Sequence, residues 1–595
     1  MTEPSQIGTS LLAAIWIGRG GEIRHRLQAP LTWTYGEHHS FGLLQAPGPR
    51  PPERVALQDW LLRGCPDPAP ERNAFVLAHL DSQRDHLRVV VGARPGTSAV
   101  VSSSDDQLIV GTSLPQVMGI RQAPITLDTE VLADLVVDFD DGVRTPFVGV
   151  HRIRPGHLLE AGLGSPGGPR RWFRPEEVTP LTPAQARDSD TLMRDAVASA
   201  VAESLPATGD VGACVSGGLD STMVAACAAR RLHPDGRVLH GFSHAPLPGT
   251  PDPSPHRDAS DEPFARLMAE TTPGLDLEIV VNHSRTLPMD LLPDVFERSW
   301  QPPLFVDNLP WIYHINELAV SRGLSVLLTG QTGNATFSAS PARVPATLLR
   351  CGNLLDGVRA FRNGVHQAGA ADTLRGLGLG MSQPVRAWVT QRAAERRAQA
   401  SIKGSLGVWD AMSIEGRREA VGQAHRKLRT APQSRGRIRD FMLASRTTSM
   451  IMESSSAGIW WADPLGDQEV VRLAMSLPLS EWNRGGIPRS VARRAGRGLI
   501  PEEIRRRARR GGQAVDIPLL RRERIGDYCL ALDRVAASPV TSGFIDTESL
   551  QRLRDGLASN RGDSPLLTTT LDRAITIGLY AIWLTETKAT PTGSP

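Results

Sequence analysis

The sequence predicts an α/β protein in two parts, an N-terminal part that is mostly β and a C-terminal part built on a parallel sheet. Residues 1–175 alternate short apolar runs with turn-rich stretches, as strands of antiparallel sheets do. Residues 186–590 open with apolar runs that alternate with helical patterns, which is typical of a parallel sheet covered by helices on both faces. We expect residues 176–185 to be a linker and residues 591–595 a disordered tail.

Composition places the chain among ordinary globular proteins. Its 595 residues are 40% hydrophobic and 22% charged, and a net charge of +3 does not by itself indicate nucleic-acid binding. No apolar run reaches the roughly eighteen residues of a membrane span, and the first residues lack the basic leader of a signal peptide. Five scattered cysteines without CxxC spacing favour reduced thiols. We therefore expect a cytoplasmic protein with no membrane span and no nucleic-acid partner.

Short apolar runs mark the expected strands. In the N-terminal part they lie at 74–80, 87–91 and 108–110. In the C-terminal part the four expected parallel strands are Val211–Val215, Val238–Phe242, Ile279–Val281 and Ser325–Thr329. Ligands of such sheets bind at the carboxyl ends of the strands, so the turns that follow these runs are the candidate site.

The turn after the first parallel strand has the composition of an anion-binding loop. It reads Ser-Gly-Gly-Leu-Asp-Ser over residues 216–221. Two glycines let the backbone approach a ligand, and the helix that begins here directs free N–H groups and its positive dipole end toward it. The loop lacks the Lys-Ser/Thr ending of a Walker motif. A carboxylate at Asp220 requires a cation beside the phosphates, which indicates a metal-bound polyphosphate. A tight turn without a ligand is the structural alternative.

Residues 216–221 resemble the SGG[LI]DS pyrophosphate loop of the ATP-pyrophosphatases, the group that includes asparagine synthetases. The resemblance implies an enzyme that splits ATP between the α- and β-phosphates, joins AMP to a carboxylate and lets an amine displace it. ATP and Mg²⁺ are the implied cofactors, with Asp220 as catalytic residue and metal ligand. The implied nucleotide-binding residues are Val215, Ser216, Gly217, Gly218, Leu219, Asp220, Ser221, Thr222, Phe242, Ser243, Thr329, Gly330 and Arg507.

A second apolar run leads into a glycine turn at residues 327–334 and resembles the GExxDE motif of asparagine synthetases. Asn334 stands in place of an acidic metal ligand, and its amide oxygen would coordinate without bringing charge. Gln331 stands in place of a glutamate near the acceptor and cannot act as a base; β-lactam synthetases carry a tyrosine there. We count both as catalytic residues, with Asn334 as a second metal ligand. A turn without chemistry is the alternative.

The basic segment 499–511 resembles the family pattern in which an arginine and a lysine follow a Leu-Pro pair. Arg507 matches the arginine, and Arg509 matches the lysine that steadies negative charge. Because arginine stays protonated, Arg509 could bind phosphate or an oxyanion but could not shuttle a proton. A solvated helix face or an RNA-binding patch has the same composition.

Two further segments have open interpretations. Residues 246–260 are rich in Pro, Asp and Ser and predict a surface loop, or a lid over nucleotide. Trp460 and Trp461 lie beside a segment, 462–467, that resembles an acceptor motif of asparagine synthetases. They predict either a large apolar acceptor pocket or ordinary packing.

The N-terminal part resembles the glutaminase β-sandwich (αββα) of asparagine synthetases at residues 91–96, 154–157 and 171–172. In those glutaminases the nucleophile is an N-terminal cysteine, whereas this sequence begins Met-Thr-Glu-Pro and its first cysteine is Cys65. We expect a glutaminase-like domain without its nucleophile, kept for structure or docking. A nucleophilic N-terminal threonine is the alternative.

The combination of motifs is similar to that of the lasso-peptide cyclases, which are macrolactam (isopeptide) synthetases. The resemblance implies that an Asp or Glu side chain of a precursor core peptide is adenylated and then attacked by the peptide's own N-terminal amine. A leader-recognition protein and a leader peptidase of the same pathway are the implied partners. The alternatives are an asparagine or β-lactam synthetase, a tRNA-modifying pyrophosphatase and a non-catalytic scaffold.

Overall fold

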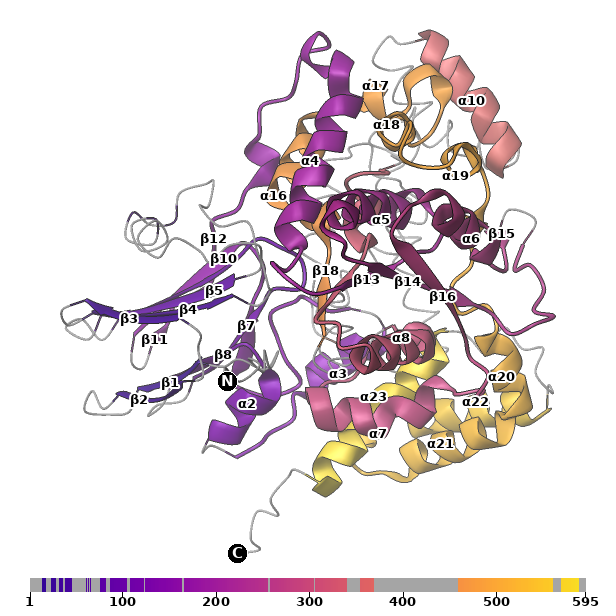
Figure 1. The fold of residues 1–595 in the computed structure, drawn as a ribbon. Helices are drawn as coiled ribbons and strands as arrows, with labels where there is room; N and C mark the ends of the chain where they lie inside the picture. Colours follow the sequence, from indigo (N-terminus) through magenta and orange to yellow (C-terminus); the bar gives the residue numbers. More distant parts are fainter. Residues whose placement is uncertain are drawn as a thin grey trace, which may run out of the picture.

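The structure is a computed structural model, and Figure 1 shows its ribbon. Between residues 13 and 44 it describes the backbone of four strands. The other described residues are 60, 63, 65, 75–81, 86–103, 108–121, 124–137, 139–162, 165–254, 257–303, 305–339, 354–368, 412, 459–559 and 569–587. The predicted tail at 591–595 and the first residues of the chain lie outside these ranges.

Two antiparallel sheets form the N-terminal part. Their strand orders are β2-β1-β8-β7-β9 and β11-β10-β6-β5-β4-β3, with β12 paired to β10. The bounds are β1 Ala13–Ile17, β2 Ile23–Leu27, β3 Leu31–Tyr35, β4 His38–Leu44, β5 Phe75–Asp81, β6 His86–Val91, β7 Ala99–Ser103, β8 Leu108–Gly111, β9 Val150–Ile153, β10 His157–Gly162, β11 Ser165–Pro166 and β12 Arg170–Arg171. Val89 and Val91 of one sheet share a buried core with Val101 and Val110 of the other, so the sheets pack face to face. The three predicted strands are confirmed.

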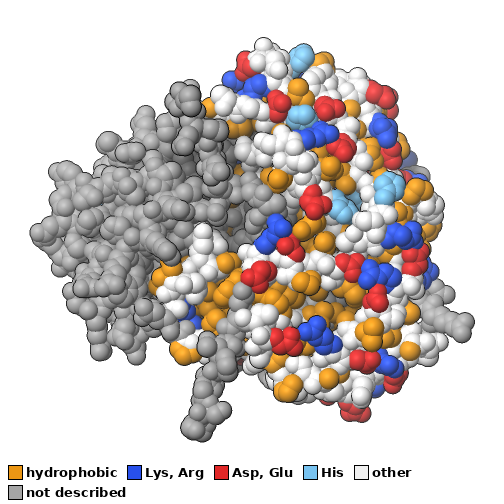
Figure 2. Space-filling view, turned by 60° about the horizontal axis from the view of Figure 1, so that its bottom comes forward, with side chains coloured by type: hydrophobic (Ala, Val, Ile, Leu, Met, Phe, Trp, Pro, Cys, Tyr) orange, Lys and Arg blue, Asp and Glu red, His pale blue; other side chains and the backbone are white. Residues whose placement is uncertain are grey.

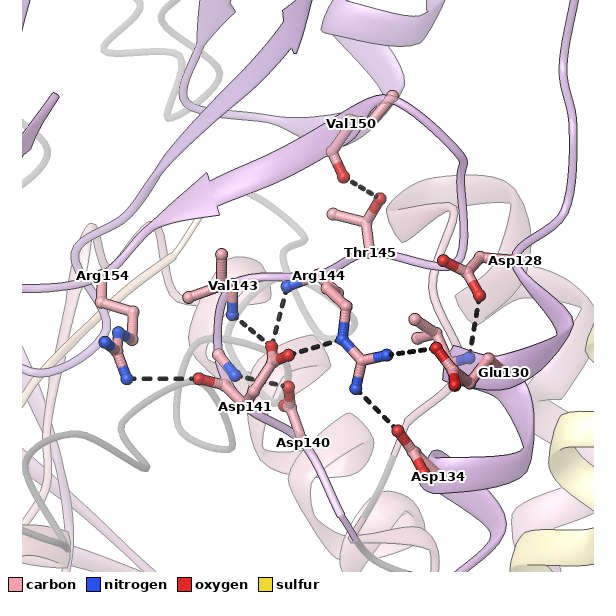
Figure 3. A network of polar contacts seen from close by, with 12 residues as sticks. Asp128, Glu130, Asp134, Asp140, Asp141, Val143, Arg144, Thr145, Val150 and Arg154 are labelled. Atoms are coloured by element: carbon pink, nitrogen blue, oxygen red, sulfur yellow. Dashed lines mark hydrogen bonds and ion pairs between the residues drawn. The ribbon is translucent and has the colours of Figure 1, made fainter. Parts of the chain in front are cut away.

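Ion pairs fix the loop that leads from α3 (Thr129–Val136) to β9. The Arg144 guanidinium contacts Asp141 at 2.6 Å, Asp134 at 2.7 Å and Glu130 at 3.3 Å (Figure 3). Backbone N–H groups of Val143 and Arg144 also donate to Asp141. These acidic side chains are therefore paired within the fold, and the network holds the loop against α3.

The C-terminal part is built on a parallel sheet of strand order β16-β14-β13-β17-β18. The bounds are β13 Val211–Cys214, β14 Leu239–Ala245, β16 Leu275–Val281, β17 Val326–Leu328 and β18 Trp460–Ala462. The four strands predicted from the sequence are confirmed within a few residues. The fifth strand, β18, was missed. It adds Trp461 to the core beside β17. Of the two interpretations of this residue, the structure supports packing, and the indole N–H donates to the buried Asn316 side chain at 2.7 Å.

Helices cover both faces of this sheet (Figure 1). Because side chains of a strand alternate between faces, Val326 and Leu328 pack with one set of helices, while Leu327 packs with Ile312 and Ile315 of the other. The first set is α4 Ser189–Ser204, α5 Leu219–Leu232, α6 Glu262–Thr271 and α16 Gln468–Ser476, and the second includes α8 Leu309–Ser321.

A further helix of the N-terminal part is α2 Leu114–Ile120. The remaining helices extend the C-terminal part and are α7 Pro288–Ser299, α10 Leu354–Ala368, α17 Leu479–Trp482, α18 Ser490–Ala495, α19 Glu502–Arg506, α20 Ile517–Glu523, α21 Ile525–Ala537, α22 Thr547–Ser559 and α23 Thr569–Thr587. On the face shown in Figure 2, basic and acidic side chains are interspersed. In the part of the chain that the structure describes, no helix combines the length and hydropathy of a bilayer span.

Candidate functional site

The first candidate loop connects β13 to α5 at the carboxyl end of the parallel sheet. The Val215 N–H donates to the carbonyl of Phe242 at 2.8 Å, which continues the pairing with β14. The Ser216 N–H donates to Ser221 Oγ at 3.1 Å, and the two hydroxyls lie 2.9 Å apart. Gly217 has a left-handed φ of +61°, and a Cβ there would lie 2.4 Å from Phe264 Cβ. Only glycine fits this turn.

The N-terminus of α5 is open toward the loop. Its N-cap is Gly218, which has no side chain to accept from the first-turn N–H groups. Two buried hydroxyls near this strand edge, those of Thr222 and Ser243, have no hydrogen-bond partner among the described residues. Free donors at a helix N-terminus favour an anion. The predicted nucleotide-binding residues of this loop thus lie together.

Asp220 stands between the two glycine loops. One carboxylate oxygen, Oδ2, accepts from the Ser338 hydroxyl at 2.9 Å, while Oδ1 is buried without a partner in the described ranges. Burial raises the pKa of Asp220 to about 6, although Arg489, the Ser338 hydrogen bond and Arg510 act to lower it. An under-satisfied carboxylate in such a place is a candidate ligand for a cation.

The second loop, 329–334, packs directly on the first. A Cβ at Gly330 would lie 2.8 Å from the Ser221 nitrogen, and a Cβ at Gly333 would lie 2.3 Å from Asp220 Oδ1. The backbone of η5 (Gln331–Asn334) therefore forms one wall of the Asp220 site. The Gln331 side chain is half-buried and the Asn334 side chain is exposed. The loops meet as the sequence predicts, and the chemical roles of these two side chains stay predictions.

Asp463, which follows β18, anchors the second loop. Its Oδ2 accepts from the Thr332 backbone N–H at 2.7 Å and also from the Thr332 hydroxyl, and its Oδ1 accepts from the Leu465 N–H at 3.2 Å. Burial raises the pKa of Asp463 to about 6 against the effect of these hydrogen bonds. No role was predicted for Asp463, because the candidate loops were identified by a glycine turn after an apolar run, and Asp463 is followed by Pro464.

Two arginines act on the Asp220 carboxylate from the C-terminal basic segments. Arg489 is half-buried, and among the described residues nothing pairs with its guanidinium group. Burial and the neighbouring Arg510 lower its pKa to about 10, while Asp220 raises it, so it is protonated at neutral pH. Its backbone has a left-handed φ of +59°, which strains a non-glycine residue. Arg489 begins the basic stretch 489–494, which the sequence marks as part of the C-terminal motif, but its action on Asp220 depends on the tertiary fold.

The two predicted arginines lie instead against the acidic segment 252–261. Arg507 contacts Asp258 at 2.5 Å and Asp261 at 2.6 Å, and its guanidinium carbon lies 3.8 Å from the centre of the Phe264 ring. Since Phe264 packs on Gly217, Arg507 supports the first loop from behind. Arg509 is 44% exposed and contacts Asp252 and Asp258, each at 2.7 Å.

The segment predicted to be a surface loop or lid is thereby tied to the basic segment. Residues of β15 (Arg257–Asp258) pair in parallel with β19 (Arg510–Gly511). The structure brings Arg507 close to the first loop through Phe264 but holds Arg509 on carboxylates of this segment. The role of Arg509 as a phosphate clamp stays a prediction.

The site residues fit a magnesium-bound polyphosphate in which the protein supplies a single carboxylate ligand, that of Asp220. Within the described ranges, no three His, Cys, Asp or Glu side chains are grouped as a metal centre would require. Asp220 would therefore act as a single protein carboxylate, and phosphate oxygens and water would complete the coordination of the hard cation. The free Oδ1 and the open N-terminus of α5 are consistent with that division of ligands.

Comparison with known proteins agrees with this architecture. The family model described as asparagine synthase matches residues 192–579. A glutamine-hydrolysing asparagine synthetase of Zea mays is 35% identical over 199 residues, 31% of this chain and 30% of that protein. Asparagine synthetase 2 of Arabidopsis thaliana is 34% identical over 187 residues, 30% of this chain and 29% of that protein. The chain thus aligns with only about 30% of the length of these relatives.

A solved structure of the allosteric regulatory enzyme of purine biosynthesis aligns over 44% of this chain and 64% of its own. Its identity is 10% and its TM-score 0.14, so that likeness supports no conclusion. The family match spans more than half of the 595 residues and includes both glycine loops and Asp220. The chain therefore belongs to the asparagine synthase family.

Proposed function

We propose that this chain is an ATP-dependent amide ligase that forms AMP and pyrophosphate and closes a macrolactam ring in a lasso-peptide precursor. The observation that carries the ligase proposal is the Asp220 site. There, a carboxylate with a free oxygen lies between an uncapped helix N-terminus and a second glycine loop, within the electrostatic influence of Arg489. The family match supports ATP as the nucleotide.

The first step transfers the adenylyl group. A carboxylate oxygen of an Asp or Glu side chain attacks the α-phosphorus of ATP, the bond to the bridging oxygen breaks, and pyrophosphate leaves. The chain's part is to hold the phosphates and offset charge: the N–H groups of α5 and the Arg489 guanidinium supply positive potential. Bound magnesium would supply further charge neutralisation, held by Asp220. We assign Asn334 to the same metal.

The second step forms the amide. The peptide's N-terminal amine attacks the carbonyl of the mixed anhydride, AMP leaves, and the nitrogen loses a proton. Gln331 cannot accept that proton, so a substrate group, the AMP phosphate or water takes it. The enzyme's main contribution is then to hold the amine against the carbonyl. A leader-recognition protein and a leader peptidase would deliver the trimmed peptide.

The direct test is mass spectrometry of candidate leaderless peptides incubated with the full chain, ATP and Mg²⁺. We expect a product lighter by one water and stoichiometric AMP, and neither product with Asp220→Ala. ATP labelled at the γ-phosphate should release labelled pyrophosphate. Release of ADP would refute adenylation, and AMP formation without any peptide product would refute the macrolactam assignment.

An asparagine synthetase-type ligase is the second candidate, because the relatives that match part of this chain carry that name. It predicts that free aspartate with ammonia is converted to asparagine at the expense of ATP. Asparagine formation from aspartate and ammonia, with no reaction of peptides, would favour this candidate.

A further inference from the structure

A buried ion pair joins the antiparallel part of the chain to the parallel part. Arg94, on the turn between β6 and β7, has 1% exposure, and its Nη2 lies 3.2 Å from Oδ2 of the fully buried Asp467. Its Nη1 donates to the Ser204 hydroxyl at 2.9 Å, at the end of α4. The next residue, Pro95, fills the space at Gly466, where a Cβ would lie 2.5 Å from the proline ring.

This pair is connected to the second loop, 329–334, through η7 and through the hydrogen bonds between Asp463 and Thr332. Asp467 caps α16 by accepting from the Glu469 N–H at 2.9 Å, and it ends η7 (Pro464–Gly466). At the other end of η7, Asp463 holds the N–H and hydroxyl of Thr332. The Leu465 carbonyl in between accepts from the Thr336 hydroxyl at 2.8 Å. The position of η7 therefore sets the position of the second loop.

The second loop in turn forms the wall of the Asp220 site. Gly330 and Gly333, on either side of Thr332, lie in contact with the backbone and the carboxylate of Asp220. A displacement of η7 by a fraction of an ångström would either crowd or release that carboxylate. Packed contacts transmit such shifts because the interior is close-packed.

Stability alone does not account for the Arg94–Asp467 pair. Burying two charges costs desolvation free energy that their attraction only partly offsets, so a buried ion pair is weak support for a stabilising role. Fixing one geometry is a better attested use of such pairs. Arg94 also contributes to the field at Asp463, where it acts to lower the pKa that burial raises.

We propose that Arg94 is a positioning residue: the turn of the antiparallel part braces η7 and thereby holds loop 329–334 against Asp220. This inference rests on the proposed function in one respect, that loop 329–334 belongs to a nucleotide site. It gives the N-terminal part a role in the nucleotide site that needs no nucleophile. The brace acts through Asp467, Asp463 and Thr332, and Arg94 itself touches no substrate.

The test compares two variants of the full chain that remove buried groups from the same part. Arg94→Gln removes the brace. Val89→Ala removes buried methyl groups from the core between the two antiparallel sheets, away from η7. Hydrogen–deuterium exchange of peptides that cover residues 327–338 is measured in the absence of nucleotide. We expect Arg94→Gln to speed exchange there about tenfold and Val89→Ala to leave it unchanged.

Asp467→Asn is the second variant, because it keeps an acceptor for the α16 cap and removes the charge of the pair. It should reproduce the local effect of Arg94→Gln, and Arg94→Lys should restore part of the protection. Unchanged exchange in Arg94→Gln, or equal acceleration by Val89→Ala at the same loss of melting temperature, would overturn the proposal. Binding of Mg·ATP to the wild-type chain is measured separately, so a failure of the proposed function is recognised by itself.

Discussion

Gly333 lies against the carboxylate of Asp220, so closely that a Cβ atom at position 333 would stand 2.3 Å from Oδ1. The same Cβ would lie 2.4 Å from the carboxylate carbon and 2.6 Å from Leu465 Cδ1. Neither neighbour is the free end of a flexible chain, because Asp220 is held by Ser338 and Leu465 is buried. This contact fixes one oxygen of the carboxylate relative to the second loop.

Gly333→Ala should therefore abolish nucleotide-dependent activity and lower stability by about 1–3 kcal/mol, the usual cost of overpacking. ATP consumption and thermal melting measure the two effects. Gly526→Ala in α21 is the matched control, since a Cβ there meets nothing within 4 Å. Wild-type activity in Gly333→Ala would show that the Asp220 carboxylate is free to move without loss of function.

Asp220→Asn should abolish ATP consumption and at the same time stabilise the fold at alkaline pH. Burial raises the pKa of Asp220 in the folded protein from 3.8 to about 6. Between pH 3.8 and pH 6 the folded protein therefore binds more protons at this carboxyl group than the unfolded chain does. The stability contributed by this group is therefore present below about pH 4 and lost as pH rises through 6. At pH 8 the variant should gain about 3 kcal/mol over wild type, with little gain at pH 4.

Thermal melting of both proteins across this pH range measures the difference. Glu270→Gln, at an exposed position of α6, is the control and should follow the wild-type curve. A gain that is equal at both ends of the pH range would contradict the burial of an ionised Asp220.

Arg489→Gly should weaken binding of Mg·ATP and raise the melting temperature. The change removes the guanidinium group that acts on Asp220, and it relieves a left-handed backbone that only glycine adopts without strain. Loss of one charge-assisted contact to phosphate corresponds to about 10–100-fold in affinity. Calorimetric titration with a non-hydrolysable ATP analogue measures it. Arg497→Ala, exposed in the same segment, should bind as wild type does; equal weakening in both variants would argue for a general charge effect.

Arg509 tests whether the basic segment binds phosphate or only holds the segment at 252–261. Arg509→Lys should retain partial activity if positive charge is sufficient, whereas Arg509→Ala should reduce the rate of AMP formation. The ion pairs with Asp252 and Asp258 are solvent-accessible and screened by water, so their loss should leave the melting temperature nearly unchanged. Arg509→Ala that forms AMP and product at the wild-type rate would exclude the clamp.

Most strands of the parallel sheet and the loops that follow them could be predicted from the sequence, because they depend on local patterns. Apolar runs followed by glycine turns predicted the strands β13, β14 and β17 and the loops after them, since parallel strands are buried on both faces and place their carboxyl ends at one edge. β18 escaped prediction because three residues, two of them tryptophans, give no periodicity. Its identity as a strand comes from pairing with β17, which lies more than a hundred residues earlier in the chain.

Residues 216–221 are enough to predict the first loop, because adjacent glycines, a helix start and Asp220 are consecutive and their chemistry follows from local backbone geometry. The distant groups that complete the site could not be predicted in this way. Ser338, Asp463 and Arg489 reach it because the sheet and its covering helices bring separate segments together, and Arg509 is kept on acidic residues by the same packing. Burial and charge at a point in space depend on all segments that meet there, and no single stretch of sequence contains that information.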